Sequence, residues 1–210
     1  MDRKRLMVKV CGMTRQEDAD ACMELGADLL GFIFHAPSPR NVTPEQAAAI
    51  ATSGVLRVGV FVRQSPDEVR QIMATARLDL AQLAGNQDPD FCRAVGPEQV
   101  VRVFFPERHA SIANLEAELL RFAGCMRYAL LDAGSSGGGT GRSLPFASLA
   151  DIQPPAPWLL AGGLSAANLA EALSQCSPAG VDINSGVESA PGLKDRAKLE
   201  AAFAAVASFR

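Results

Sequence analysis

Short apolar runs alternate along the chain with longer segments in which hydrophobic residues recur at helical spacing. Most of the runs lack a strict polar alternation, which is typical of parallel strands that are covered on both faces. This pattern predicts strands at residues 6–10, 28–34, 55–62, 78–83, 99–105, 128–132, 158–161 and 180–183.

Small polar residues mark the starts of the expected helices. Thr43, Ser65 and Asp88 each precede a proline, and a polar cap followed by proline in the first turn is a common helix opening. Thr14 and Ser165 open further segments that contain alanine and glutamate. The last helix is expected at about residues 194–209. Each expected strand is therefore followed by a helix or a helix-like turn.

Repeated strand and helix units predict an α/β fold, a single-domain (β/α)8 TIM barrel over residues 1–210, near the short end of the size range for that fold. A doubly wound open sheet shares the alternation and is the main alternative. It would lead us to expect a G-x-G-x-x-G turn after the first strand, and the sequence KVCGMT does not supply one. Because no linker rich in Pro, Gly or Ser divides the chain, we prefer one barrel domain.

Composition narrows the classes of partner. A chain of 210 residues with 48% hydrophobic and 20% charged residues is ordinary for a soluble globular protein, and a net charge of -3 argues against nucleic acid. The N-terminal apolar stretch is too short and broken for a signal peptide or membrane span. Five scattered cysteines without a C-x-x-C pair are typical of reduced thiols in a cytosolic protein. We expect a cytoplasmic monomer or homodimer that binds neither nucleic acid nor membranes.

Glycine-rich segments follow three of the late strands. In a barrel, functional groups lie at the C-terminal ends of the strands and in the following loops, and phosphate often binds after the seventh and eighth strands. Glycine lets backbone N–H groups approach an anion closely. The segments GGGTG, AGGLS and NSG therefore favour a phosphate site over the alternative of flexible turns. Arg142, beside the first segment, is interpreted as a solvated loop residue.

Two strand ends carry groups that can move protons. Cys11 follows the first expected strand and Asp132 ends the sixth. A thiol has an ordinary pKa of about 8.5 and a carboxyl group one of about 4, so the environment must shift both toward neutrality before they work as base and acid. Position alone leaves other roles open, namely a small buried apolar residue for Cys11 and a helix cap or loop hydrogen bond for Asp132.

Six motifs occur in an order that resembles the phosphoribosylanthranilate isomerase family, over about residues 9–195. They are KVCGMT, SPR, AQL with the glycine that follows, LLDAGSSGGGTG, LLAGGL and DINSGVESAPGLKD. The resemblance implies a barrel enzyme of tryptophan biosynthesis that needs no cofactor or metal. The implied reaction is the Amadori rearrangement of N-(5-phosphoribosyl)anthranilate, a phosphorylated small molecule, to 1-(2-carboxyphenylamino)-1-deoxyribulose 5-phosphate.

The resemblance also implies roles for individual residues. Cys11 is the expected general base, Asp132 the general acid, and Arg40 the residue that binds the substrate carboxylate. Asp182 either supports the intermediate or holds its loop, and Glu188 is interpreted as structural. The other expected substrate contacts are Gln82 at the end of the fourth strand and, around the phosphate, Gly139, Thr140, Gly162, Gly163, Asn184 and Ser185.

One position departs from the family pattern. Where the family usually has QLHG, this chain has QLAG, so Ala84 replaces a histidine at the end of the fourth strand. The two histidines present, His35 and His109, lie elsewhere and are interpreted as solvated loop residues. Two other functions stay open: a barrel isomerase or lyase acting on another sugar phosphate, and a phospho-ligand-binding protein with weakened catalysis.

Overall fold

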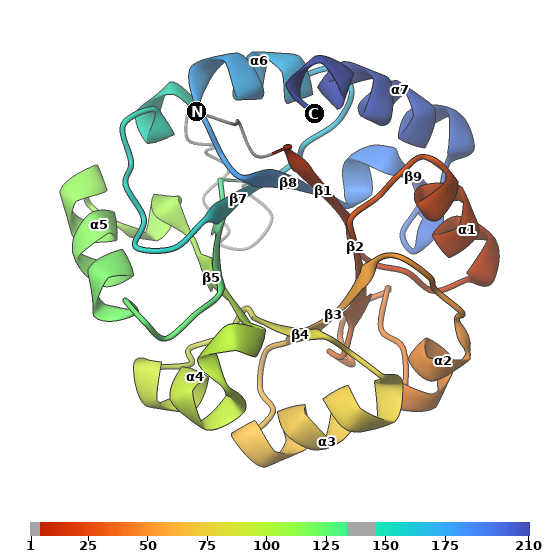
Figure 1. Cartoon of the computed structure of the whole chain (residues 1–210), viewed down its shortest axis with the longest axis horizontal. Coiled ribbons are helices and arrows are strands. Elements are labelled where there is room, and N and C mark those ends of the chain that lie inside the picture. Colours follow the sequence, from red (N-terminus) through yellow and green to blue (C-terminus); the bar gives the residue numbers. More distant parts are fainter. Residues whose placement is uncertain (1–4, 134–145) are drawn as a thin grey trace.

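A closed ring of parallel strands lies inside a ring of helices (Figure 1). The computed structural model describes residues 5–133 and 146–210. The strands pair in chain order, and the last of them pairs with the first. The expected (β/α)8 barrel is therefore confirmed, and the doubly wound alternative is wrong. The barrel strands are β1 (Met7–Val10), β2 (Leu29–Ile33), β3 (Leu56–Phe61), β4 (Leu80–Leu83), β5 (Val100–Phe104), β6 (Tyr128–Asp132), β7 (Trp158–Ala161) and β8 (Gly180–Ile183).

Helices follow most of the strands. They are α1 (Gln16–Glu24), α2 (Pro44–Ala49), α3 (Pro66–Ala76), α4 (Pro89–Val95), α5 (Ile112–Arg121), α6 (Leu169–Gln175) and α7 (Arg196–Val206). Between β6 and β7 the described residues contain the short 3-10 helix η4 (Phe146–Leu149). Other 3-10 turns are η1 (Pro97–Gln99), η2 (Pro106–Arg108), η5 (Ser185–Val187) and η6 (Ala207–Phe209).

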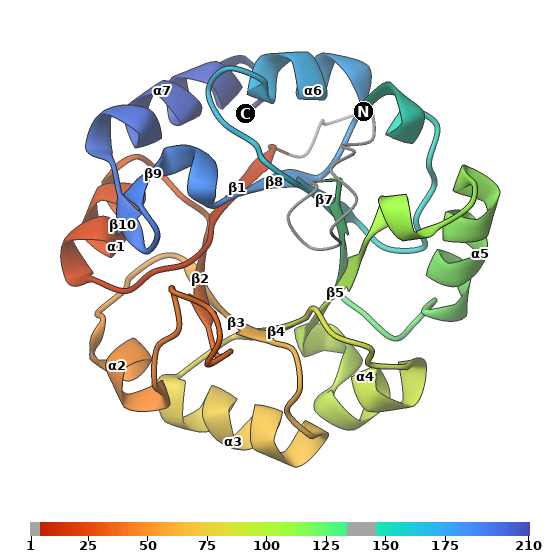
Figure 2. The same cartoon turned by 180° about the vertical axis from the view of Figure 1, so that it is seen from behind.

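An antiparallel hairpin follows β8 and was not expected from the sequence. It consists of β9 (Glu188–Ala190) and β10 (Leu193–Lys194). Figure 2 shows it beside α1 and α7. The backbone N–H of Lys194 donates to the Asp18 carboxylate of α1, and Lys198 of α7 donates to the carbonyl of Glu188. The hairpin is thus bound to the first and last helices of the barrel.

Local capping explains where several helices begin. Thr43 and Ser65 form capping boxes with Gln46 and Glu68, and the Asp88 side chain accepts from the N–H of Phe91, as expected. The two other expected starts are wrong in position. The N-cap of α1 is Arg15, and the Thr14 hydroxyl donates to the carbonyl of Gly192 instead of capping the helix. A turn follows Ser165, and α6 begins only at Leu169.

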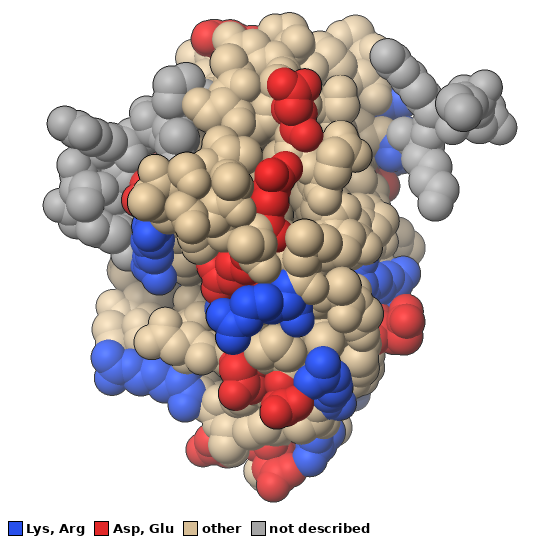
Figure 3. All heavy atoms as spheres, turned by 90° about the vertical axis from the view of Figure 1, so that its left-hand side faces the viewer, with Lys and Arg blue, Asp and Glu red and all other residues tan. Residues whose placement is uncertain are grey.

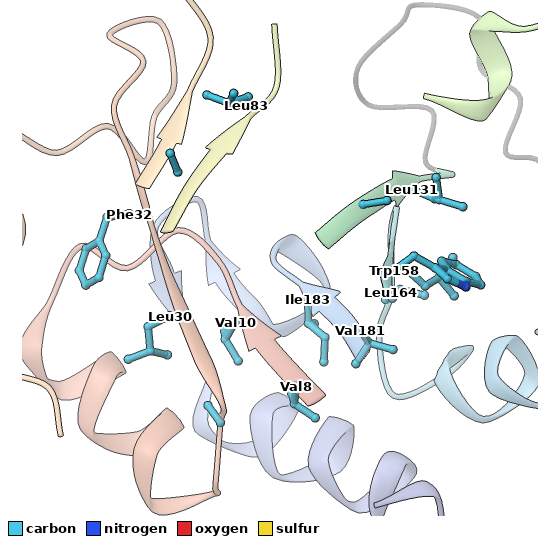
Figure 4. Close-up of a cluster of buried hydrophobic side chains, with 14 of the residues drawn as sticks. Val8, Val10, Leu30, Phe32, Leu83, Leu131, Trp158, Leu164, Val181 and Ile183 are labelled. Carbon is cyan, nitrogen blue, oxygen red and sulfur yellow. The ribbon is translucent and has the colours of Figure 1, made fainter. Parts of the chain in front are cut away.

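The pleat of the strands separates two apolar clusters. Alternate residues point outward and pack beneath the helices, and Figure 4 shows Val8, Val10, Val181 and Ile183 in this outer cluster. The other residues point inward and fill the barrel, as in the layered interior of this fold. The inner cluster consists of Leu29, Val58, Leu80, Val101, Val103, Leu130, Leu159 and Ala161.

Charge and thiol chemistry agree with the sequence analysis. Acidic and basic side chains are interspersed on the face that carries α5, without a continuous basic area (Figure 3). All five cysteines are unpaired and buried in the structure. Within residues 5–133 and 146–210, no helix has the length and apolar character needed to cross a membrane.

Candidate active site

A cavity of about 460 Å³ opens at the C-terminal ends of the strands. Every strand of the barrel, or the loop after it, contributes to its wall, so it lies at the end where barrels bind their substrates. All of the expected site residues that the structure describes meet here. The wall contains Cys11, Arg40, Gln82, Asp132, Gly162, Gly163, Asp182, Asn184 and Ser185, together with Ile33, Val60, Ala84, Val103, Phe105, Leu130, Ala161, Leu164 and Gly186.

The inward alternation of the strands explains this convergence. On β6, Leu130 points into the barrel, so Asp132 two residues later points the same way. On β4, Leu80 is an inner residue, which directs Gln82 into the interior as well. Each of these polar groups lies nearer the C-terminal end of its strand than the apolar inner residue before it. The polar side chains therefore form the floor of the cavity above an apolar plug.

Cys11 and Asp182 share the interior with a buried lysine. Lys9 is fully buried, and its Nζ donates to Asp182 Oδ1 at 2.8 Å. Burial raises the pKa of the Cys11 thiol, and the Lys9 ammonium opposes that shift. Although burial disfavours the charged lysine, Asp182 and Cys11 hold the pKa of Lys9 above its ordinary value. The charges of Lys9, Cys11 and Asp182 thus influence one another where β1 pairs with β8.

Arg40 reaches the cavity from the loop after β2, and Glu188 of β9 holds its guanidinium. Arg40 Nε donates to Glu188 Oε1 at 2.9 Å, and Arg40 Nη2 donates to Oε2 at 2.6 Å. These hydrogen bonds raise the pKa of Arg40. The family resemblance implies a carboxylate-binding arginine here, and in the structure the carboxylate of Glu188 already engages one edge of that arginine.

Glu188 is the centre of a buried network that sequence reasoning did not resolve. Besides Arg40, it accepts from Lys194 Nζ at 2.9 Å and from the N–H of Gly192 at 3.2 Å. Burial works to raise the pKa of Glu188, but the hydrogen bonds from Arg40 and Lys194 bring it below its ordinary value. Lys194 also donates to Asn184 Oδ1 at 3.1 Å. Glu188 was interpreted as structural, and its contacts specify that role: its carboxylate orients the Arg40 guanidinium.

The sequence analysis did not identify two lysines that belong to the site, Lys9 and Lys194. A signal for Lys9 was present, because a lysine within an apolar parallel strand run needs a buried partner. Lys194 gave no comparable signal, since the hairpin that buries it was not expected. Both lie beside expected site residues, Lys9 beside Asp182 and Lys194 beside Asn184.

The loops after β7 and β8 pack against each other through glycine. A Cβ at Gly186 would lie 2.0 Å from the carbonyl oxygen of Leu164, so only glycine allows the two loops to approach this closely. Gly162 and Gly163 have φ values of 110° and 65°, which other residues rarely adopt. The two expected phosphate loops therefore form one continuous part of the cavity wall.

Gln82 and Ala84 both line the cavity at β4. The Gln82 side chain is buried, and its Oε1 accepts no hydrogen bond from the part of the chain that the structure describes. A buried acceptor without a partner is costly, so Gln82 is a strained element of this part of the wall. Ala84 is half-buried and packs against the inner cluster. A small apolar side chain thus stands where a histidine was expected from the family pattern.

The other residues that the sequence analysis considered lie apart from these groups or beyond the described chain. Gly139, Thr140 and Arg142 lie outside the described residues. His109 does not line the cavity but pairs with Glu118 of α5, with Nε2 and Oε2 2.9 Å apart. His35, in the loop after β2, does not line the cavity either.

Comparison with known proteins shows that this chain is similar to members of one enzyme family. The family model described as N-(5'phosphoribosyl)anthranilate (PRA) isomerase matches residues 8–205. An N-(5'-phosphoribosyl)anthranilate isomerase of Maridesulfovibrio salexigens is 53% identical over 201 residues, which cover 96% of this chain and 98% of that protein. The similarity at sequence level therefore extends over nearly the whole chain.

Solved structures show the same relationship. The crystal structure of phosphoribosyl anthranilate isomerase from Thermus thermophilus has a TM-score of 0.82 and 38% identity, covering 98% of this chain and 100% of that one. A structure of the isomerase in complex with reduced 1-(o-carboxyphenylamino)-1-deoxyribulose 5-phosphate has a TM-score of 0.81 and 28% identity, with 97% and 99% covered. The whole barrel is therefore similar to these enzymes in fold.

Proposed function

Because this chain belongs to the phosphoribosylanthranilate isomerase family, we propose that it catalyses the Amadori rearrangement of N-(5-phosphoribosyl)anthranilate in tryptophan biosynthesis. The observation that supports this most directly is the shared cavity. Cys11, Asp132 and Arg40 line it together with the glycine loops after β7 and β8. One cavity thus offers a base, an acid, a carboxylate partner and a phosphate site.

Asp132 is the proposed general acid. Its proton goes to the ring oxygen of the ribose, the bond between that oxygen and C1 breaks, and the anilinic nitrogen forms a protonated Schiff base. The inward position of Asp132 at the end of β6 aims the carboxyl group at the cavity. Proton transfer of this kind contributes about a hundredfold or more to the rate.

Cys11 is the proposed general base. It removes the proton on C2, which the adjacent iminium group acidifies, and the resulting enolamine tautomerises to the ketone. The overall reaction is an isomerisation, so no oxidant, reductant or co-substrate is consumed. Cys11 is only 4% exposed, and this exposure suits a base that must meet a carbon acid away from bulk water.

The carboxylate and the phosphate of the substrate are assigned to different parts of the cavity wall. Arg40 receives the anthranilate carboxylate, because a guanidinium with one edge held by Glu188 can still donate from the rest of its fork. The phosphate lies against the loops of Gly162, Gly163, Asn184 and Ser185, with Gly139 and Thr140 as further proposed donors. Gln82, whose side chain lines the cavity, is a further proposed substrate contact. Asp182, in the cavity floor, acts through the hydrogen bond that it accepts from Lys9.

The test is an assay of the purified protein with phosphoribosylanthranilate, in which the loss of anthranilate fluorescence is followed. We expect turnover in the absence of added metal or cofactor. Tight binding of the substrate without turnover would instead favour a phospho-ligand-binding protein. Turnover of other sugar phosphates alone, in a panel run alongside, would favour a different barrel isomerase or lyase.

A further inference from the structure

A lysine without access to the cavity lies directly beneath the proposed base. Lys9 points into the barrel from β1, two residues before Cys11, so both side chains lie on the same side of the strand. Its exposed fraction is 0%, and it is not part of the cavity wall that the described residues form. Lys9 therefore cannot contact a bound substrate.

Glycine on the neighbouring strand makes room for this arrangement. A Cβ at Gly31 of β2 would lie 2.7 Å from Cys11 Sγ and 3.1 Å from Lys9 Nζ. The Cys11 thiol and the Lys9 ammonium thus both lie close to the β2 backbone at Gly31. Any larger residue there would force one of them to move.

A buried ammonium needs compensation, and two groups supply it here. Asp182, paired in register with Lys9 across β1 and β8, accepts its hydrogen bond at 2.8 Å. The Cys11 thiolate would interact with Lys9 by charge and contributes to the raised pKa of Lys9. Because attraction between charges is stronger inside a protein than in water, Lys9 acts strongly on whichever group next to it can become an anion.

The other charged groups around Cys11 have smaller effects. Lys194 lowers the pKa of the thiol, and Asp182 raises it. The Arg40 guanidinium also interacts with Cys11 by charge. Burial makes the largest contribution and raises the pKa of the thiol, while Lys9 makes the largest contribution in the opposite direction.

We propose that Lys9 is a positioning residue that stabilises the thiolate of Cys11 in the buried floor of the site, with Asp182 holding its ammonium in place. The inference rests on the proposed role of Cys11 as the base. The S–H proton of Cys11 leaves to solvent water before the reaction, and the thiolate later accepts the C2 proton of the substrate. Lys9 keeps its own protons throughout and transfers none.

The experiment compares Lys9→Met with the wild-type protein by alkylation. Cys11 is labelled with iodoacetamide from pH 6 to 10, and the labelled cysteine is identified by mass spectrometry. We expect labelling of Cys11 at pH 8 to slow by at least about tenfold, the change in thiolate fraction that follows a shift of one unit in pKa. Burial raises the pKa of Cys22 to about 12. Cys22 is therefore the internal reference, and its labelling should be the same in Lys9→Met as in the wild type.

Kinetics separate this role from a purely structural one. Lys9→Met should lower kcat by at least about tenfold and shift the acid limb of the pH–rate profile to higher pH, while KM changes less than about twofold. Arg121→Met, which removes an exposed positive charge at the end of α5, is the matched control and should change neither. An unchanged labelling profile for Cys11 in folded Lys9→Met would overturn the proposal.

Loss of Lys9 leaves Asp182 as an unpaired buried charge, so the variant can fail to fold. Lys9→Met combined with Asp182→Asn removes both charges and is the second variant. Because Lys9 acts on Cys11 more strongly than Asp182 does, labelling should still be slower than in the wild type. Wild-type labelling rates in this variant would also overturn the proposal. Labelling needs no isomerase activity, so an active Cys11→Ala variant would refute the proposed base while leaving the effect of Lys9 separately measurable.

Discussion

At the scale of the residue, the two proton-transfer groups are the most direct test. Cys11→Ala and Asp132→Asn should each lower kcat by at least about a hundredfold, with smaller effects on KM, because each removes a general base or acid. Steady-state kinetics measure this, and unchanged circular dichroism establishes folding. Cys22→Ala removes another buried thiol away from the cavity and should keep full turnover. Near wild-type kcat in either site variant would refute the role assigned to that residue.

Ala84 tests how far the chemistry depends on a histidine. The natural protein should be active, because none of the proposed proton transfers uses the side chain at this position. Since Ala84 lines the cavity, Ala84→His should raise kcat/KM by up to about tenfold, or ~1.4 kcal/mol in the barrier. Ala84→Leu adds volume without an imidazole and serves as its control. No activity in the natural protein, with strong activity in Ala84→His, would contradict the proposed function.

At the scale of the element, the loops after β7 and β8 act as one unit. Gly186→Ala places a methyl group against the Leu164 carbonyl, so the loops must separate and the proposed phosphate site must distort. KM and the inhibition constant of inorganic phosphate should both rise by at least about tenfold, since small misplacements of a bound group are costly. Competition assays measure both.

A glycine at the other end of the barrel provides the control. Gly124 follows α5 before β6, has a φ of 72°, and has open space where a Cβ would lie. Gly124→Ala strains the backbone and should lower the melting temperature without changing either constant. If phosphate fails to compete in the wild type, or if Gly186→Ala leaves both constants unchanged, the assignment of these loops to phosphate is wrong.

At the scale of the whole molecule, Glu188 joins early and late parts of the chain. It links Arg40, 148 residues away, to the hairpin after β8. Because its folded pKa lies below its ordinary value of 4.5, the charged form stabilises the native state. This contribution is fully present above about pH 4.5 and is lost as the pH falls through the lower, folded pKa.

Glu188→Gln should therefore be less stable than the wild type at pH 7, and the difference should shrink as the pH falls toward 3. Urea midpoints at several pH values measure this. Glu68, which caps α3 and is exposed, is the comparison, and Glu68→Gln should give a smaller effect at pH 7. A stability difference for Glu188→Gln that stays constant from pH 7 to pH 3 would contradict the role of its charge.

The sequence by itself determined the strands of the barrel and the polar side chains of the cavity wall. Apolar runs marked all the strands of the barrel, and capping residues such as Ser65 marked helix starts, because both depend on neighbours a few residues away. Strand ends such as Asp132 were placed correctly, since parallel strands in a barrel bring their C-terminal ends together.

Only the tertiary structure decided which charges meet. Lys9 and Asp182 are 173 residues apart in the chain and become neighbours when β8 closes against β1. The pairing of Arg40 with Glu188 needs the hairpin of β9 and β10, whose short strands give no periodic signal. Local patterns specify which face a side chain occupies, whereas barrel closure and loop packing specify which partner it finds there.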